Sequence, residues 1–196
     1  DGFNSRIRQL TTSDLIIENL GDDKDIIFKC DDGSGGVQTY LTIDGGLESV
    51  IVPDTIYLAA GGGLDLSLRH DGSNSHIQNN TGDLTIKNTA NDKDIIFQSD
   101  DGSGGLTDYL TLDGSSGYTK AHKHILYEDN AKAMFGTGGD MQILHDGSNS
   151  YISQNVTGNL YIENNATDGD VVFRSDDGSG GTTEYFRVDG SSVANV

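Results

Sequence analysis

The chain has no tryptophan, one proline and one cysteine, and its 12 Lys and Arg residues face 31 Asp and Glu residues, a formal net charge of −19 over 196 residues. Nucleic-acid binding depends on Lys and Arg contacts to phosphate, so this charge excludes a nucleic-acid partner held in that way. It also disfavours an anionic membrane surface. No apolar stretch approaches the roughly 18 residues of a membrane span, so we expect no membrane insertion.

Apolar residues are also scarce, at 34% of the chain. A typical globular chain has about 45–50%. A monomer this polar struggles to bury enough surface to offset the entropy lost on ordering its backbone. Because the chain starts at Asp1 without a methionine, we also expect it to be a segment of a longer protein.

One unit recurs three times: a short apolar strand, an acidic glycine-rich turn, and a second strand closed by Asp-Gly. Its copies are DIIFKCDDGSGGVQTYLTIDG from Asp25, DIIFQSDDGSGGLTDYLTLDG from Asp94 and DVVFRSDDGSGGTTEYFRVDG from Asp170. Cys30 is replaced by serine in the other two copies and has no partner for an intrachain disulfide. The position therefore requires a small side chain rather than thiol chemistry.

A second motif precedes each of these units. It reads HDGSNSHIQNNTGDLTIKN from His70 and HDGSNSYISQNVTGNLYIEN from His145, with a diverged copy, DGFNSRIRQLTTSDLIIEN, from Asp1. Length varies only in the first turn and between the repeats, which indicates loops or less constrained strands there. We predict a divergent repeat at 1–46, a spacer at 47–69, a repeat at 70–115, a longer spacer at 116–144, a repeat at 145–191 and a tail at 192–196.

The strands are predicted from alternation, because apolar side chains on every second residue are typical of a half-buried strand. Three sets of residues share a face on this pattern: Leu84 and Ile86; Leu64, Leu66, Leu68 and His70; Leu110 and Leu112. Asp-Gly, Asn-Thr-Gly and Gly-Ser-Gly-Gly bound the strands and favour tight turns. The chain is therefore predicted to be all-β, with one helical turn as an alternative at Tyr127–Phe135.

Each predicted strand offers only one narrow apolar row and leaves sheet edges open. A monomeric sandwich is an alternative, but strands this short supply too little core. Closing the rows around a threefold axis removes the edges and provides the missing core. We therefore predict a parallel homotrimer: an elongated repeat structure, of β-helix or β-prism type, with the Asp-Gly turns outside.

Several segments resemble the repeated modules of tail fibre and appendage proteins from marine bacteriophages. They are HDGSNSYI from His145, the following GNLYIENN, and DVVFRSDDGSGGTTEYFRVDGS from Asp170. KAMFGTGGDMQILHDG from Lys132 is similar to the linker before each module. The first copy lacks the His and Ser of HDGS, and the spacer around Leu47 to Tyr57 also departs. The resemblance implies a trimeric fibre located in the virion, with other virion proteins and a host surface glycan or protein as partners.

The paired carboxylates of the acidic turns have three interpretations: turn formation, weak cation binding, or acid–base cleavage of a glycoside. The pairs are Asp31/Asp32, Asp100/Asp101 and Asp176/Asp177. An active site is single, whereas these pairs recur in every copy with the same glycines. Two adjacent Asp residues also supply too few oxygens for Ca²⁺. We therefore predict that they form turns.

Histidines offer the sharpest candidate site. His122 and His124 share a face if they lie on a strand, and three copies would then place their imidazoles around one axis. Such a set suits iron, nickel or zinc, and His-x-His pairs hold metal in the tips of some phage fibres, which the resemblance makes relevant. Solvated histidines are the alternative, and no cofactor is required. His70 and His145 either cap a strand through a neighbouring carbonyl or stack near the axis to hold an anion or metal.

The leading functional prediction is a non-enzymatic structural segment of a trimeric phage tail fibre or virion appendage, which extends toward the host and displays surface to it. The second is an adhesin, with a receptor- or glycan-binding surface at Tyr118–Met134. The third is a polysaccharide depolymerase, for which no unique carboxylate cluster is present. The sequence also lacks a Ser-His-Asp set, a P-loop and Cys/His zinc spacing.

Overall fold

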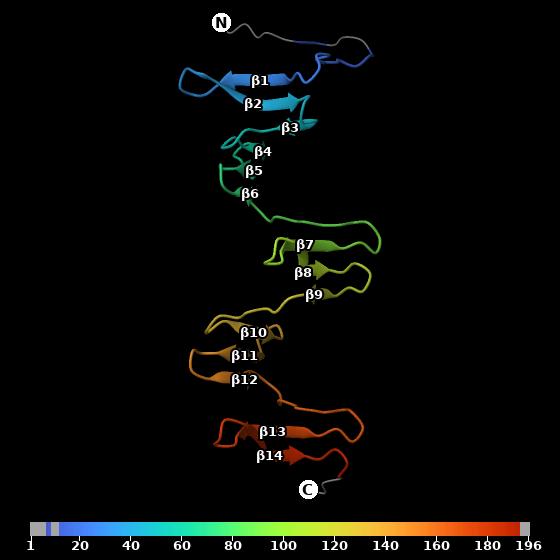
Figure 1. The fold of residues 1–196 in the computed structure, drawn as a ribbon, viewed down its shortest axis with the longest axis vertical. Coiled ribbons are helices and arrows are strands. Elements are labelled where there is room, and N and C mark those ends of the chain that lie inside the picture. Colours follow the sequence, from blue (N-terminus) through green and yellow to red (C-terminus); the bar gives the residue numbers. More distant parts are fainter. Residues whose placement is uncertain (1–6, 9–11, 193–196) are drawn as a thin grey trace. The chain divides into compact units, whose positions relative to one another are not determined.

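The computed structural model describes residues 7–8 and 12–192. Every regular element in these ranges is a β-strand, which confirms the all-β prediction (Figure 1). The strands form five small antiparallel sheets, none of which closes on itself. None of the described residues belongs to a helix that could cross a membrane. By its internal contacts the chain divides into two units, Asp1–Lys87 and Asn88–Val196.

Three sheets are built on the repeated acidic hairpin, and we call them the hairpin sheets. The first unit holds β1 (Ile26–Asp31), β2 (Val37–Asp44) and β3 (Ser49–Ile51). The second unit holds the equivalent β7 (Ile95–Asp100), β8 (Leu106–Leu112) and β9 (Thr119–Ala121), and then β13 (Val171–Asp176) with β14 (Thr182–Val188). In each sheet the strands pair in chain order.

The other two sheets carry the His-Asp-Gly motif at the end of their middle strand, and we call them the His-Asp-Gly sheets. They comprise β4 (Leu58–Ala60), β5 (Leu66–His70) and β6 (Ser75–Asn79) in the first unit, and β10 (Lys132–Phe135), β11 (Met141–His145) and β12 (Ser150–Gln154) in the second. Their ladders have equivalent registers. Residues 1–6 and 9–11 of the diverged copy from Asp1 lie outside the described residues.

The two predicted spacers contain strands rather than only loops. β3 and β4 fall within 47–69, and β9 and β10 fall within 116–144. The helical turn considered for Tyr127–Phe135 is wrong. The chain instead makes a turn in which Ala131 N–H donates to the Glu128 carbonyl at 2.9 Å, and it then enters β10. Leu64 was predicted to lie on a strand, but it has a φ of 59° and precedes β5. The repeat boundaries themselves stay a prediction.

Each hairpin contains a β-bulge at a tyrosine. Phe28 pairs with Leu41 while Lys29 pairs with Thr39, which leaves Tyr40 as the extra residue. Tyr109 and Tyr185 are the extra residues of the other two hairpins. A bulge bends its strand and changes the direction of a side chain. Here the tyrosine hydroxyl donates to the carbonyl of Asp31, Asp100 or Asp176, at 2.9, 3.0 and 3.0 Å.

Each hairpin also presents four apolar side chains on one face, because residues paired across an antiparallel ladder lie on the same side. The sets are Ile26, Phe28, Leu41 and Ile43; Ile95, Phe97, Leu110 and Leu112; Val171, Phe173, Phe186 and Val188. The predicted shared face of Leu110 and Leu112 is thus confirmed. In the third set the rings of Phe173 and Phe186 pack with their centroids 5.6 Å apart.

These apolar faces are not covered by the chain itself. None of the described apolar side chains is buried, and Phe28, Phe97 and Phe173 remain 43%, 46% and 47% exposed. The chain exposes 16194 Å². A folded monomer of its mass, 20.8 kDa, exposes about 9,000 Å². The part of a single chain that the structure describes therefore has strands and turns but no hydrophobic core.

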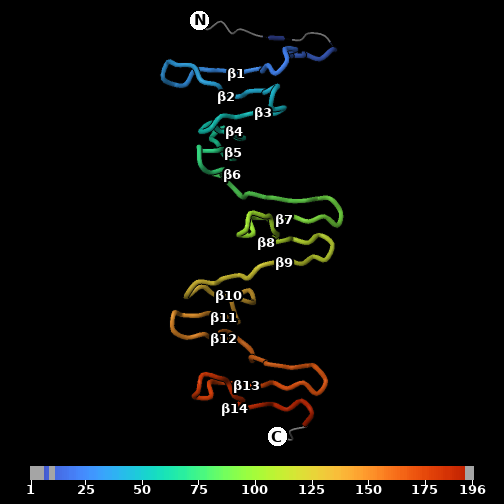
Figure 2. Tube along the Cα trace, viewed as in Figure 1, coloured from blue at the N-terminus to red at the C-terminus, as the bar shows by residue number. Residues whose placement is uncertain are grey.

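Three further stretches, residues 14–18, 83–87 and 159–163, are neither strand nor helix, and we call them the extended segments. The prediction of a half-buried strand around Leu84 and Ile86 is wrong for the single chain: they are 47% and 60% exposed and belong to no ladder. Figure 2 shows the third segment between β12 and β13. Alternation makes a segment suitable for a sheet, but a strand also needs a neighbouring strand to bond.

Candidate functional site

The most regular polar clusters are the acidic turns, residues 31–36, 100–105 and 176–181. In the middle copy Asp100 Oδ1 accepts the Gly102 N–H at 2.6 Å. Asp101 Oδ1 accepts three bonds, from the Ser103 N–H at 2.7 Å, the Ser103 hydroxyl at 2.7 Å and the Gly105 N–H at 3.1 Å. The same bonds recur in the other two copies. This confirms the prediction that the paired carboxylates form turns.

The same contacts set the electrostatics of these turns. The Ser hydroxyl, followed by the turn N–H groups, lowers the pKa of Asp32, Asp101 and Asp177 below the ordinary value of an Asp. A general acid for glycoside cleavage needs the opposite shift, because it must carry a proton near neutral pH. The geometry therefore suits a carboxylate that holds a turn closed.

A second polar cluster closes the open end of each hairpin, and sequence reasoning missed it. Asp94 Oδ1 accepts the Gly114 N–H at 2.9 Å, and the Asp94 carbonyl accepts the Asn88 side-chain amide at 3.0 Å. A Cβ at Gly114 would lie 2.3 Å from the Lys93 carbonyl oxygen, so only glycine fits. The equivalent bonds recur at Asn19, Asp25 and Gly45 and at Asn164, Asp170 and Gly190. The available signal was the constant spacing of Asn, Asp and Gly in all copies.

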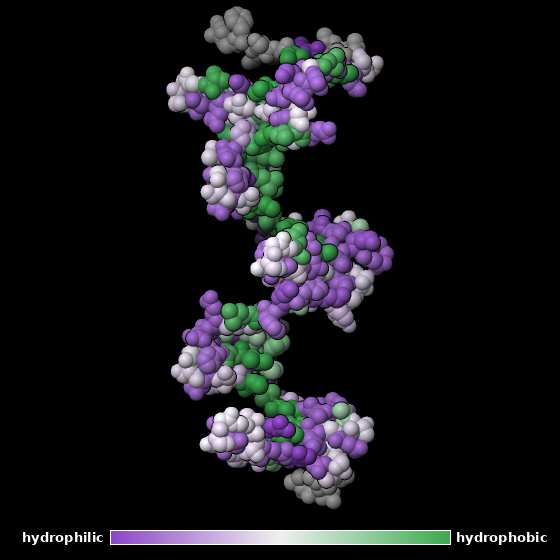
Figure 3. All heavy atoms as spheres, in the orientation of Figure 1, coloured by the Kyte–Doolittle hydropathy of each residue, from purple (hydrophilic) through white to green (hydrophobic). Residues whose placement is uncertain are grey.

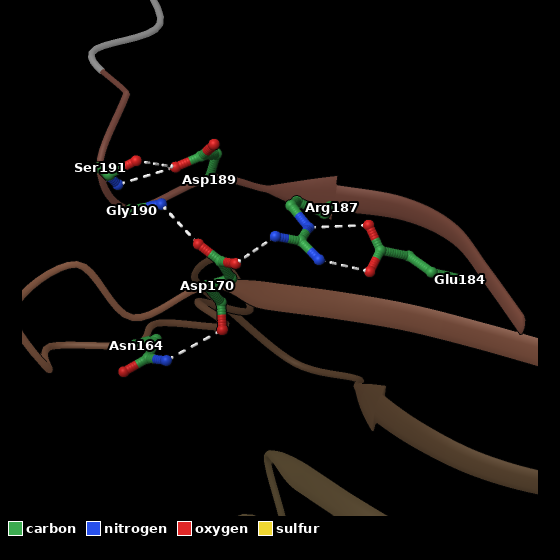
Figure 4. Close-up of polar contacts among 7 residues, drawn as sticks. All are labelled: Asn164, Asp170, Glu184, Arg187, Asp189, Gly190 and Ser191. Atoms are coloured by element: carbon green, nitrogen blue, oxygen red, sulfur yellow. Dashed lines mark hydrogen bonds and ion pairs between the residues drawn. The ribbon is translucent and has the colours of Figure 1, made fainter.

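We call this cluster of Asn, Asp and Gly bonds the clamp of the hairpin. The third hairpin adds an ion-pair network to its clamp (Figure 4). Arg187 donates to both carboxylate oxygens of Glu184, at 2.7 and 2.6 Å, and to Asp170 Oδ2 at 2.8 Å. These contacts lower the pKa of Glu184 and raise that of Arg187. Because the Arg187 side chain is 44% exposed, such pairs add little stability. In the two hairpins that have a third strand, Thr42 and Thr111 stand at the position of Arg187.

His70 and His145 end the middle strands of the His-Asp-Gly sheets, on the predicted face of their apolar neighbours. The predicted capping bond to a carbonyl is wrong. His70 Nδ1 lies 2.9 Å from Asp54 Oδ1 and 3.2 Å from the Gly72 nitrogen, and His145 Nδ1 lies 3.1 Å from Ser150 Oγ. These bonds place both imidazoles beside their own turns. A shared axial site for anion or metal stays a prediction.

The Asp that follows each of these histidines closes the next turn. Asp71 Oδ1 accepts the N–H groups of Ser73 and Asn74 at 3.0 and 2.8 Å, while Oδ2 lies 2.8 Å from His76 Nε2. In the second sheet Asp146 Oδ2 accepts a hydrogen bond from the Tyr151 hydroxyl at 2.8 Å. Tyr151 thus takes the place that His76 has beside Asp71 Oδ2 in the first sheet. The bond to the Asn N–H contributes most to lowering the pKa of both carboxyls. Histidine and tyrosine therefore serve interchangeably here as a partner on the following strand.

The structure does not place His122 and His124 on a strand. β9 ends at Ala121 and Lys123 lies in a bend, so the pair follows the strand. Both histidines nevertheless line one hollow of about 500 Å³, together with Tyr109. His122 Nε2 lies 2.9 Å from Thr111 Oγ1. No group of three or more His, Cys, Asp or Glu side chains suited to a metal occurs in the described part of the chain. The axial metal stays a prediction, tested by elemental analysis for one iron, nickel or zinc ion per three chains.

An apolar groove of about 460 Å³ connects two neighbouring sheets of the first unit. Val50 of β3 lines it together with Leu58, Leu68 and Ile77 of the adjoining His-Asp-Gly sheet. Figure 3 shows apolar side chains gathered along this part of the chain. The apolar faces of the two sheets therefore form one surface within that unit. Cys30, by contrast, is exposed on β1.

No model of a known protein family matches the chain, and no curated protein or solved structure shows significant similarity to it. The repeats and their geometry are therefore the basis on which a function is assigned.

Proposed function

We propose that the chain is a non-enzymatic structural segment of a homotrimeric fibre, such as a phage tail fibre or another virion appendage. The observation that carries this proposal is the uncovered surface. The chain exposes 16194 Å², an excess of roughly 7,000 Å² over a folded monomer of its mass. Obligate interfaces bury about 2,000–5,000 Å² or more. An excess of this size supports a chain that completes its core with other copies.

The distribution of apolar side chains supports the same conclusion. All three hairpins leave an apolar face open, and in the first unit the groove at Val50 and Leu68 continues that face onto the next sheet. Three such faces turned toward a common axis would bury one another and form a β-helix or β-prism-like shaft. The hydrophobic contribution is about 25 cal/mol per Å² of apolar surface buried. Burial of this kind is the main favourable term that the single chain lacks.

The acidic turns fit the outside of such a shaft. Their carboxylates bond to N–H groups of the same turn and leave the remaining charge in solvent. Charged turns at the surface keep an assembly soluble and oppose lateral association. The proposed mechanism is mechanical: the shaft provides reach and stiffness, and it displays the turns to the surroundings. Unfolding such a shaft requires separation of three chains, which makes it slow.

The mass in solution tests this proposal. Analytical ultracentrifugation or light scattering of the purified chain should give three times 20.8 kDa at every concentration in a dilution series. Thermal unfolding should be irreversible or dependent on scan rate, as for kinetically stable proteins. A folded, stable monomer across the series would overturn the proposal.

The adhesin remains a second candidate because of one observation. Tyr118, Ile125 and Leu126 are 69%, 60% and 89% exposed in the longer spacer. Exposed apolar residues close together in sequence are typical of contact surfaces. Binding of the trimer to a glycan array or to host cells, lost on substituting these three residues but not the acidic turns, would support an adhesive role.

A further inference from the structure

We infer that the extended segments are interchain strands, each of which pairs its backbone with a free strand edge in another copy of this chain. The inference rests on the proposed trimer, and it identifies the part of the chain that joins the copies. The third segment, residues 159–163, carries the argument because it and both of its neighbouring strands belong to the second unit.

The backbone of the segment is unused within the chain. None of the N–H or C=O groups of residues 160–163 forms a hydrogen bond to another part of the described chain. The same is true of residues 84–87 in the second copy. The stretch at 123–127 also lacks backbone hydrogen bonds to the described chain, but residues 160–163 and 84–87 occur at equivalent places in successive repeats. Such a stretch presents donors and acceptors along both of its edges, as a free strand does.

The side chains alternate as a strand requires. Leu160 and Ile162 occupy alternate positions and are 41% and 62% exposed, while Tyr161 between them is 73% exposed. Leu84 and Ile86, and Leu15 and Ile17, repeat the pattern. An isolated strand of this length has no stability in water. The pattern is therefore meaningful only if the segment joins a sheet.

The free edges lie directly before and after the segment in the chain. β12 and β13 are both edge strands, since the sheets have the orders β10-β11-β12 and β13-β14. The chain leaves the edge at β12 and returns to the edge at β13, and the segment pairs with neither. In a parallel assembly the segment of one copy lies level with these same edges in the next. Strand addition there satisfies both backbones and removes open edges.

The clamp closes the turn that joins the segment to the following hairpin. The Asn164 side-chain amide donates to the Asp170 carbonyl at 2.9 Å, and the Gly169 N–H donates to the Ala166 carbonyl at 3.0 Å. Figure 4 shows the first of these bonds, and both fix the turn between the segment and β13. The backbone at 160–163, which this turn joins to β13, forms no ladder with the hairpin. Because Asn19 and Asn88 make the same bond, all three copies have this arrangement.

Amide hydrogen exchange on the full-length chain tests the inference. In the assembled protein the amides of Leu160–Glu163 and Leu84–Lys87 should exchange at least about 100-fold more slowly than in free peptides, as amides of stable sheets do. If the mass shows a monomer, the proposed function itself fails. If the mass shows a trimer and these amides exchange at peptide rates, the trimer stands and the interchain strands are refuted.

Two variants test which face of the segment is used. Ile162→Asp places a charge in the inferred apolar row and should weaken assembly by about 100-fold or more. Tyr161→Asp is the matched control, because it places the same charge one residue away on the opposite face. It should change assembly by less than about 3-fold. Equal effects of the two substitutions would contradict strand-like insertion.

A crosslinking experiment distinguishes pairing between copies from pairing within one. A photoreactive amino acid replaces Tyr161, and trimers are assembled from a mixture of isotope-labelled and unlabelled chains. Crosslinks from position 161 to β12 or β13 should join labelled to unlabelled peptides. If every link joined peptides of the same label, the segment would pair within its own chain and the inference would be wrong.

Discussion

The acidic turns and the extended segments recur equally often, but they differ in how their polar groups are satisfied. In the turn at 100–105, Asp100 and Asp101 accept four hydrogen bonds from the turn itself. The backbone of 84–87 makes none with the described part of the chain. The difference shows which parts a single chain completes by local contacts and which parts it leaves for a partner.

The largest effect is expected where the chain is incomplete. Phe28→Asp places a charge on an open apolar face, and we expect loss of the trimer, with a cost of about 3–5 kcal/mol per chain. Lys29→Asp is the matched control: its side chain lies on the opposite face of the same strand. Sedimentation gives the mass of each variant. A trimeric Phe28→Asp protein with unchanged thermal stability would show that the face is not an interface.

A smaller effect is expected at the clamp, where the chain is complete. Gly114→Ala forces a Cβ to 2.3 Å from the Lys93 carbonyl, so we expect destabilisation by about 1–3 kcal/mol. Gly62→Ala is the control, because nothing lies within 4 Å of its added Cβ. Replacing that glycine should leave stability unchanged or raise it by up to about 1 kcal/mol. Thermal midpoints of both variants decide whether close approach matters at this position.

The acidic turns should make stability depend on pH. Their Asp32, Asp101 and Asp177 carboxyls have a lowered pKa in the folded chain, so the unfolded chain binds more protons in acid. Their stabilising contribution is therefore full above the ordinary Asp pKa of about 4 and is lost as pH falls through the lowered value. Asp101→Asn should lower the thermal midpoint at pH 7 and have less effect near pH 2. If the thermal midpoints of the Asp101→Asn variant and the unchanged protein differed by the same amount at both pH values, this account would be contradicted.

The smallest effect is expected from the tyrosine at the bulge. Tyr109→Phe removes the hydrogen bond of 3.0 Å to the Asp100 carbonyl and should cost about 0.5–1.5 kcal/mol. Tyr118→Phe is the control, since the Tyr118 hydroxyl makes no hydrogen bond in the described structure and its side chain is 69% exposed. Chemical denaturation resolves differences of this size. If both variants had the same free energy of unfolding, the Tyr109 hydrogen bond would contribute nothing to stability.

The sequence predicted the local features well because short-range chemistry determines them. Asp101 followed by glycines specifies a turn with or without tertiary contacts. The alternation at Leu110 and Leu112 likewise specifies a shared face. The Asp94–Gly114 clamp was missed because its partners lie 20 residues apart, and only their constant spacing in the three copies marks them. The bulge at Tyr109 was missed for a related reason: an extra residue in one strand is visible only once the register with the other strand is known.

The sequence by itself therefore determined the repeat, the all-β class, the acidic turns and the apolar rows of the hairpins, since each depends on residues within a few positions of one another. Only the tertiary structure decided that Leu84 and Ile86 lie outside the sheets described within the single chain and that His122 and His124 lie beyond the end of β9. The physical reason is that a strand forms only when its backbone bonds to a second strand. The position of that partner cannot be derived from the segment's own sequence pattern.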